Sequence, residues 1–258
     1  MAASPADNEV LSVSTSPLLR MTENKMGFMV QASDEYCDAF FGYIRSRAKP
    51  ARVADLGVAF GYTTKLLLQC GANVTANDLS ESHLNVLWNS VSKAEQHRLT
   101  LLPGNVLHID LPKEHFDGIM ACRWIHFLNG EELRKVLSKC FEALKFGGKL
   151  CLATESIYQG LFRNELERYV EEKAAGMEWP GLRRTENLVT GLLSHLPGNF
   201  MFYDTDVVER ELGRAGFTVV KVGYVDRRDV YPENGSNDRR EGLGAIAVKP
   251  RHGARKEK

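Results

Sequence analysis

The sequence predicts an α/β protein built on a doubly wound, mostly parallel sheet of seven strands, with a helical insert after the fifth strand. Short apolar segments alternate with longer segments whose apolar residues recur at helical spacing, and the connections between them are short. This rhythm breaks once, over residues 158–203, and then resumes. Strands that alternate with helices in this way form a parallel sheet with helices on both faces.

The elements before the break follow from local pattern. A helix is expected over residues 34–47, where aromatic and aliphatic side chains recur at helical spacing before Pro50. The elements expected after it are a strand Arg52–Leu56, a helix Thr63–Cys70, a strand Asn73–Ala76, a helix Glu81–Lys93, strands Leu99–Leu102 and Phe116–Cys122, a helix Glu131–Leu144 and a strand Lys149–Ala153.

The insert is expected to be helical over residues 161–175, irregular around Trp179–Gly181 and helical again near residues 187–196. Ligands of open α/β sheets bind beyond the carboxyl ends of the strands, so an insert after strand five is interpreted as a lid or substrate-facing wall. The alternation resumes with a helix Asp206–Ala215 and strands Phe217–Val222 and Gly242–Val248.

The two ends of the chain differ from the rest in composition. Residues 1–20 are rich in Ser, Pro, Ala and Asn and predict a disordered tail, and residues 251–258 predict a charged tail. A single domain is expected over residues 21–250.

Composition narrows the function classes. Lys plus Arg and Asp plus Glu both total 33, so no overall positive charge favours a nucleic acid, and this partner is disfavoured. Every apolar run falls short of the about 20 residues of a membrane span, and the N-terminus lacks a secretory pattern. The odd number of widely spaced cysteines contains no CxxC pair, so neither a disulfide framework nor a zinc site is indicated, and a cytoplasmic location is expected. These are Cys37, Cys70, Cys122, Cys140 and Cys151.

The turn after the first expected strand carries a ligand-binding pattern. Asp55 closes the strand, and Gly57, Ala59 and Gly61 follow at alternate positions before a helix. Small residues allow a ligand to approach the backbone, and a glycine at the helix start allows the helix to pack closely against the sheet. Free N–H groups at the helix start favour negative charge.

Asp55 and Asp78 indicate a nucleoside and not a dinucleotide. The spacing D-x-G-x-A-x-G departs from the GxGxxG of dinucleotide sites, and an acid directly before the turn would repel a pyrophosphate but can hold a cationic amino group. Asp78 closes the second expected strand, where a carboxylate can accept both ribose hydroxyls.

At these residues the sequence resembles the class I S-adenosylmethionine-dependent methyltransferases, which have a Rossmann-like fold. The resemblance covers roughly residues 50–153, with a looser similarity to residue 248. The motifs that carry it are Asp55–Gly61, Asp78–Ser80, Gly104–Val106, Phe116–Cys122 with the following Trp124–Leu128, and Leu144–Leu150.

The resemblance implies S-adenosylmethionine as the cofactor and a set of residues that bind it. Ala59 stands where the middle glycine is commonest, and Asn105 replaces a more frequent Asp but can still accept from the adenine amino group. The implied cofactor-binding residues are Asp55, Gly57, Ala59, Gly61, Asp78, Leu79, Asn105, Val106 and Cys122.

Methyl transfer from a sulfonium needs mainly alignment, and it needs a base only where the acceptor loses a proton. The catalytic candidates are His126 in the loop after strand four, and Glu155 and Tyr158 after strand five; each also has a purely structural interpretation. Arg123 can receive an acidic substrate or pair with an acid. No metal is expected, because no carboxylates converge after strand four.

Aromatic and Met residues of the insert and the N-terminal flank can line an acceptor pocket or form core. They are Phe28, Met29, Tyr36, Phe162, Tyr169, Trp179, Phe200, Phe202 and Tyr203.

The leading functional hypothesis is O- or N-methylation of a small molecule, favoured by the neutral charge and the insert. The alternatives are a protein side-chain methyltransferase and a non-catalytic, cofactor-binding activator subunit. Nucleic-acid methylation is disfavoured because Cys122–Ile125 stands in place of an N/D-P-P-Y/F motif, and an NAD-dependent oxidoreductase is remote.

Overall fold

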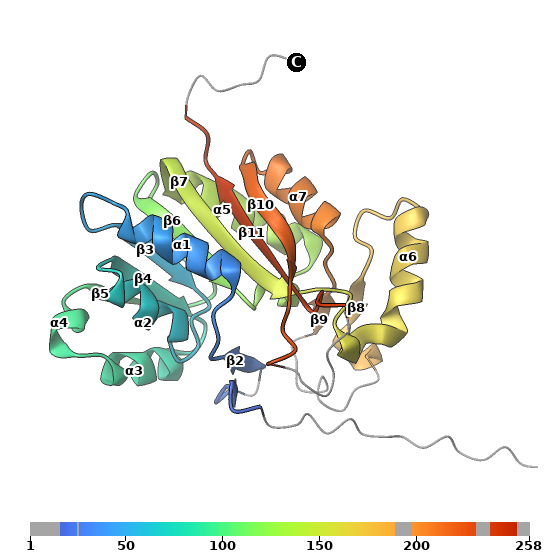
Figure 1. The fold of residues 1–258 in the computed structure, drawn as a ribbon, viewed down its shortest axis with the longest axis horizontal. Helices are drawn as coiled ribbons and strands as arrows, with labels where there is room; N and C mark the ends of the chain where they lie inside the picture. Colours follow the sequence, from blue (N-terminus) through green and yellow to red (C-terminus); the bar gives the residue numbers. More distant parts are fainter. Residues whose placement is uncertain (1–15, 25, 189–197, 231–237, 252–258) are drawn as a thin grey trace, which may run out of the picture.

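The structure of the protein is a computed structural model that describes residues 16–24, 26–188, 198–230 and 238–251. Its centre is a seven-stranded sheet in the order β10-β11-β7-β6-β3-β4-β5 (Figure 1). The five strands from β5 to β7 pair in parallel, whereas β11 pairs antiparallel with both β7 and β10. The predicted α/β class and the mostly parallel sheet are therefore confirmed. The strands are β3 (Arg52–Leu56), β4 (Asn73–Asp78), β5 (Leu99–Pro103), β6 (Phe116–Cys122), β7 (Leu144–Glu155), β10 (Thr218–Val225) and β11 (Gly242–Val248).

Helices cover both faces of the sheet, because the parallel strands are apolar on both sides. Figure 1 shows α1, α2 and α3 on the near face and α5 and α7 on the far face. Each layer encloses its own apolar core against the sheet. The helices are α1 (Glu35–Arg45), α2 (Tyr62–Gln69), α3 (Glu81–Ser90), α4 (Lys93–Gln96), α5 (Gly130–Ala143) and α7 (Thr205–Arg214).

Side-chain caps fix where several helices begin. Asp34 accepts hydrogen bonds from the backbone N–H groups of Tyr36 and Cys37 at the start of α1. Asn129 and Glu132 form a reciprocal capping box at the start of α5. Such caps satisfy N–H groups that the helix leaves without partners, and each stabilises by about 1 kcal/mol.

The strand β7 begins earlier than the sequence pattern predicts. It starts at Leu144, directly after α5, and its pairing with β6 shifts register between Phe116 and Gly118. Gly147 lies within this irregular part with a φ of +81°, a conformation that glycine adopts without strain. The Gly147–Gly148 pair therefore lies inside the strand instead of before it.

The predicted disordered tail over residues 1–20 is wrong at its end. Residues 16–20 are described, and β1 (Leu19–Met21) pairs antiparallel with β2 (Phe28–Val30) in a hairpin. The apolar residues at 28–30 supply the partner strand, which the composition of the tail does not reveal. The rest of that tail, residues 1–15, lies outside the described residues, as does most of the expected C-terminal tail.

The insert forms a small subdomain with its own apolar cluster, and it is only partly helical as predicted. The helix α6 stands beyond one end of the sheet next to the β8–β9 pair (Figure 1). Buried Arg183 links the two parts, donating to Glu165 at 2.6 Å and Glu172 at 2.9 Å. The helix expected near residues 187–196 falls largely outside the described residues. The elements are the 3₁₀ helices η2 (Gly160–Glu165) and η3 (Thr185–Asn187), α6 (Leu166–Ala174), β8 (Leu182–Arg184) and β9 (Asn199–Met201).

Candidate active site

A cavity of about 370 Å³ opens at the carboxyl ends of the parallel strands. Its lining comes from the turn after β3, the end of β4, the loops after β5 and β6, and the end of β7. The β1–β2 hairpin and the insert complete the walls. This size suits a small ligand, and the position is the one at which open α/β sheets bind their ligands.

Gly57 allows close approach at the turn after β3. Its φ is +71°, and a Cβ there would lie only 2.4 Å from the Trp124 ring. Trp124 lines the cavity, and its indole N–H has no hydrogen-bond partner among the described residues. Gly57 was expected to make room for a ligand. In the structure, the absence of a side chain at Gly57 first makes room for the Trp124 indole.

Gly61 has a packing role and does not line the cavity. It is the N-cap of α2 with a φ of +79°, and a Cβ there would lie 2.3 Å from the side chain of Leu87 on α3. The close packing at the helix start is thus directed toward the neighbouring helix α3, whereas packing against the sheet was expected.

Asp55 does not reach the cavity, which contradicts its expected contact with a cationic amino group. The residue is 1% exposed, and its Oδ2 accepts hydrogen bonds from the hydroxyls of Thr63 at 2.8 Å and Thr64 at 2.7 Å. These threonines lie in the first turn of α2, so Asp55 fixes β3 to that helix. Burial raises the pKa of the Asp55 carboxyl to about 7, although both threonine hydroxyls oppose the shift.

Asp78 faces the cavity from the end of β4. Its Oδ2 accepts the backbone N–H of Ala59 at 2.7 Å, and its Oδ1 accepts the N–H of Ser80 at 2.8 Å. His83 Nδ1 lies 3.0 Å from the same Oδ1. Ala59 also lines the cavity and has a φ of +47°, which explains why glycine is favoured at this position. The contact with Asp78 holds this unfavourable backbone conformation.

The loop after β5 forms a third side of the cavity. Asn105 Oδ1, the atom expected to accept from the adenine amino group, accepts the backbone N–H of Leu107 at 2.9 Å. This hydrogen bond stabilises the turn of the loop. Val106 is buried, whereas Leu79 is 55% exposed, and both line the cavity. An apolar pair beside an amide matches the surroundings of a flat heterocycle.

Glu155 lies at the end of β7 inside a buried ionic network. Its Oε1 accepts a hydrogen bond from Arg227 Nη1 at 2.8 Å, and Glu241 accepts the Arg227 backbone N–H at 3.0 Å. Arg227 is 2% exposed and also lies 3.7 Å from Asp34. Glu155 lines the cavity, and its Oε2 is buried without a hydrogen-bond partner in the described part of the chain. The network thus leaves one carboxylate oxygen available to a ligand.

His126 lines the same cavity as a neutral imidazole. Burial lowers its pKa to about 3, and the charge of Arg227 adds to this effect. Its Nδ1 lies 3.2 Å from the hydroxyl of Thr154, and its ring packs on Phe127 and Phe200. A base with so low a pKa takes up a proton poorly near neutral pH, so the predicted role as general base is not supported.

Tyr158 is not among the residues that line the cavity, which contradicts its place among the catalytic candidates. Its ring packs at 5.3 Å from the Tyr224 ring, and the Arg240 guanidinium lies 3.6 Å above it. The chain turns at Ser156, where an isolated bridge to Tyr203 begins the insert. Tyr158 therefore stabilises the base of the insert.

The aromatic set from the sequence divides between cavity and core. Phe28, Met29, Phe162 and Phe200 line the cavity. The other members do not line it, and they pack in the core or against it; they are Tyr36, Tyr169, Trp179, Phe202 and Tyr203. Arg123 lines the cavity but pairs with Asp34 at 3.3 Å, in agreement with the second interpretation of its charge.

Two groups of cavity residues were missed by sequence reasoning. Hairpin residues such as Leu19 and Thr22 line the cavity, although composition assigned part of this segment to a tail. Arg227, which holds Glu155 without lining the cavity, was not a candidate either, because nothing local indicates its contact with Glu155, 72 positions away. Trp124 and Phe127 belong to the quoted loop after β6, where their proximity to the strand end was a usable signal.

Comparison with known proteins agrees with this geometry. Residues 53–148 match a family model described as a methyltransferase domain. An uncharacterized methyltransferase of Anoxybacillus flavithermus is 28% identical over 125 residues, which cover 46% of this chain and 57% of the relative. The matched part therefore spans little more than half of that relative's length.

Solved structures resemble the whole described fold. An S-adenosylmethionine-dependent methyltransferase from Mesorhizobium loti superposes with a TM-score of 0.59 at 19% identity, covering 81% of this chain and 96% of that one. A Burkholderia thailandensis 1,6-didemethyltoxoflavin-N1-methyltransferase, with 1,6-didemethyltoxoflavin and S-adenosylhomocysteine bound, gives 0.59 at 18% identity, covering 85% and 80%.

The central part of the chain is thus similar to methyltransferase domains. The fold around it is that of the class I S-adenosylmethionine-dependent methyltransferases, as the sequence motifs indicated. Within the described residues, no helix combines the length and apolar character needed to cross a membrane.

Proposed function

We propose that the protein binds S-adenosylmethionine in this cavity and transfers its methyl group to a nitrogen or oxygen of a small-molecule acceptor. One observation carries the proposal. A single cavity joins the Gly57–Ala59 turn and the Asp78 carboxylate on one side to the Glu155 carboxylate and an apolar aromatic wall on the other. Two ligands with different chemistry fit such a divided site.

The cofactor half is formed by the residues around β3, β4 and β5. Asp78 would accept the ribose hydroxyls, since each carboxylate oxygen can accept more than one hydrogen bond, and His83 orients it. Leu79 and Val106 would hold the adenine between apolar surfaces while Asn105 accepts from its amino group. Gly57 and Ala59 give the methionine part access to the backbone, and Cys122 closes this side. Asp55 and Gly61 would stabilise the turn without touching the cofactor, Asp55 through its hydrogen bonds to α2 and Gly61 through its packing against α3.

The acceptor half is formed by the loop after β6, the end of β7 and the insert. Glu155 Oε2 and the Trp124 indole N–H are a buried acceptor and a buried donor without partners among the described residues. Leaving such groups unsatisfied costs about 1–3 kcal/mol each, so a bound molecule that pairs with them gains that free energy. Phe127, Phe162 and Phe200 favour a planar, apolar body. The Glu155 oxygen and the Trp124 N–H together favour a substrate that carries an N–H or O–H group to donate to Glu155 and an oxygen or nitrogen to accept from Trp124.

Methyl transfer at this site requires mainly alignment. The cofactor supplies a methyl group already activated on a sulfonium. Walls on several sides would hold the acceptor atom in line with it, and orientation of this kind can lower a barrier by roughly 7–11 kcal/mol. Glu155 would receive the hydrogen bond or the proton of the attacking group, because Arg227 holds its other oxygen in place. His126 would act as a neutral hydrogen-bonding group.

The cavity walls favour a small acceptor over a protein side chain. The β1–β2 hairpin and the insert both contribute to the lining. A protein substrate would need an open groove that admits a backbone. The five free cysteines in the chain support a reducing, cytoplasmic setting for this reaction.

The test combines binding with turnover. Calorimetry with S-adenosylhomocysteine should give one site per chain, and a tritiated methyl-transfer screen over metabolite pools should label material of low molecular mass. Glu155→Gln should lower the methyl-transfer rate while leaving the affinity for S-adenosylhomocysteine unchanged. Label found only in macromolecules would favour the protein-substrate alternative. Binding without any label would favour an activator subunit, and absence of binding would refute the proposal.

A further inference from the structure

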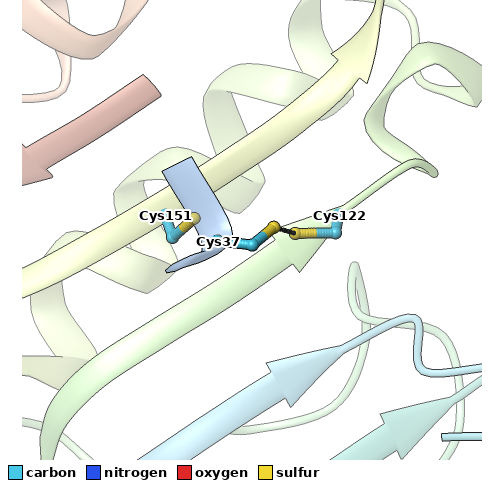
Figure 2. A group of neighbouring side chains, drawn as sticks. All are labelled: Cys37, Cys122 and Cys151. Atoms are coloured by element: carbon cyan, nitrogen blue, oxygen red, sulfur yellow. Dashed lines mark hydrogen bonds between the residues drawn. The ribbon is translucent and has the colours of Figure 1, made fainter. Parts of the chain in front are cut away.

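Three cysteines that are distant in the sequence meet beside the cavity. Cys37 belongs to the first turn of α1, Cys122 ends β6 and Cys151 lies within β7 (Figure 2). Their sulfur atoms all lie within 4.8 Å of one another. Across the part of the chain that the structure describes, this is the one group of cysteine, histidine and acidic side chains whose ligand atoms come close enough to share an ion.

We propose that Cys37, Cys122 and Cys151 form a binding site for one thiophilic metal ion of the Zn²⁺ or Cu⁺ type. The spacing of the sulfurs fits such an ion. Cys37 Sγ and Cys122 Sγ are 3.8 Å apart. A tetrahedral zinc site with Zn–S bonds of about 2.3 Å separates its sulfur ligands by about 3.8 Å. Soft thiolate ligands select zinc and copper(I) over harder cations.

The surroundings suit a negatively charged thiolate cluster. Cys37 lies in the first turn of α1, where the helix dipole favours negative charge. Arg123 directly follows Cys122 and has a φ of +64°, and its side-chain Nε is buried without a hydrogen-bond partner among the described residues. Backbone strain of this kind costs on the order of 1–3 kcal/mol and is concentrated at functional sites.

An entry path also exists. Cys37 and Cys151 are fully buried, whereas Cys122 is partly buried and lines the cavity. An ion can therefore reach the cluster from the cavity side, and a water molecule there can complete four-coordinate geometry. Binding of a divalent ion forms three metal–sulfur bonds and breaks three S–H bonds. Three protons pass to solvent, and no electrons are transferred.

The experiment uses the full chain, freed of metal with a chelator and kept reduced under anaerobic conditions. Titration with Cd²⁺, Zn²⁺ or Cu⁺ should saturate at one ion per chain, with thiolate-to-cadmium charge-transfer absorption in the Cd²⁺ arm. Loss of an outer partner alone weakens metal affinity roughly 10- to 100-fold, so removal of a ligand should weaken it at least 100-fold. This effect is expected for Cys37→Ala, Cys122→Ala and Cys151→Ala. The control Cys140→Ala removes a buried thiol outside the cluster and should bind like the wild type.

A second measurement does not depend on the folding of any variant. Alkylation of the native wild-type chain followed by mass spectrometry should show that bound Cd²⁺ protects Cys122, the partly buried member of the cluster, but not the partly buried Cys70 outside it. The proposal is overturned if no ion binds, or if the protected residues are others. A Cys37–Cys122 disulfide that forms in place of metal binding also overturns it. The metal measurements need no methyl donor, so their outcome is separate from that of the proposed function.

Discussion

Replacement of Asp78 by asparagine tests the cofactor half of the cavity most directly. The change keeps the shape of the side chain but removes its negative charge and one of its two acceptor oxygens. The remaining oxygen cannot serve the N–H groups of Ala59 and Ser80 and both ribose hydroxyls as the carboxylate can.

The expected loss follows from the hydrogen bonds. A hydrogen bond to a charged group contributes about 1.5–3 kcal/mol. If the amide oxygen retains one of two ribose contacts, the variant loses one such bond, which corresponds to a roughly 10- to 100-fold weaker affinity. Loss of both contacts would weaken binding further.

Calorimetry with S-adenosylhomocysteine measures this change, and Asp110→Asn is the matched control, because Asp110 is exposed and does not line the cavity. Thermal melting reports whether Asp78→Asn remains folded. A folded variant that binds within about twofold of the wild type would show that Asp78 does not hold the ribose, since one lost charged hydrogen bond must cost more.

Three further substitutions test the surroundings of the site. Gly57→Val should abolish S-adenosylhomocysteine binding in calorimetry, because its Cβ would lie 2.4 Å from the Trp124 ring at a φ of +71°; retained affinity would place the ligand elsewhere. Asp55→Asn should flatten the pH dependence of unfolding. The raised pKa of about 7 means that the native state binds more protons than the unfolded state between about pH 4 and pH 7, so the wild-type free energy of unfolding falls over this range and is level above it. Urea denaturation at several pH values measures this free energy. The same dependence of the unfolding free energy on pH in both proteins would contradict the prediction. Arg227→Met should destabilise by about 3–5 kcal/mol in urea unfolding, since it leaves the buried Glu155 charge without its partner; adding Glu155→Gln should restore part of the loss, and a strictly additive double variant would argue against the pairing.

The fold was predictable because its signals are local. Alternating strand and helix patterns predicted the sheet, and the closely spaced residues from Asp55 to Gly61 marked the turn after β3. Orientation was harder to predict. Asp55 does not line the cavity, and the hydroxyls of Thr63 and Thr64 in the next helix bind its carboxylate. A spacing rule cannot choose between these hydroxyls and a ligand.

Local sequence patterns could not predict contacts between segments that are distant along the chain. The Glu155–Arg227 pair joins β7 to the segment after β10, and Cys37 and Cys122 are 85 positions apart. A search for a CxxC motif finds only cysteines that are close along the chain. The three cysteines of α1, β6 and β7 are distant in the sequence and come together only in the folded structure. The hairpin was missed because composition reports on average polarity and not on a partner strand.

The short hydrogen bond from the Ala59 N–H to Asp78 connects two ends of one ligand site. The same carboxylate that would receive the ribose also holds Ala59 at a φ of +47° beside the place proposed for the methionine part. Energies measured at the two positions are therefore coupled. In a double-mutant cycle, Ala59→Gly should recover part of the affinity lost in Asp78→Asn, because glycine adopts this conformation without help; strictly additive losses would show that the two ends act independently.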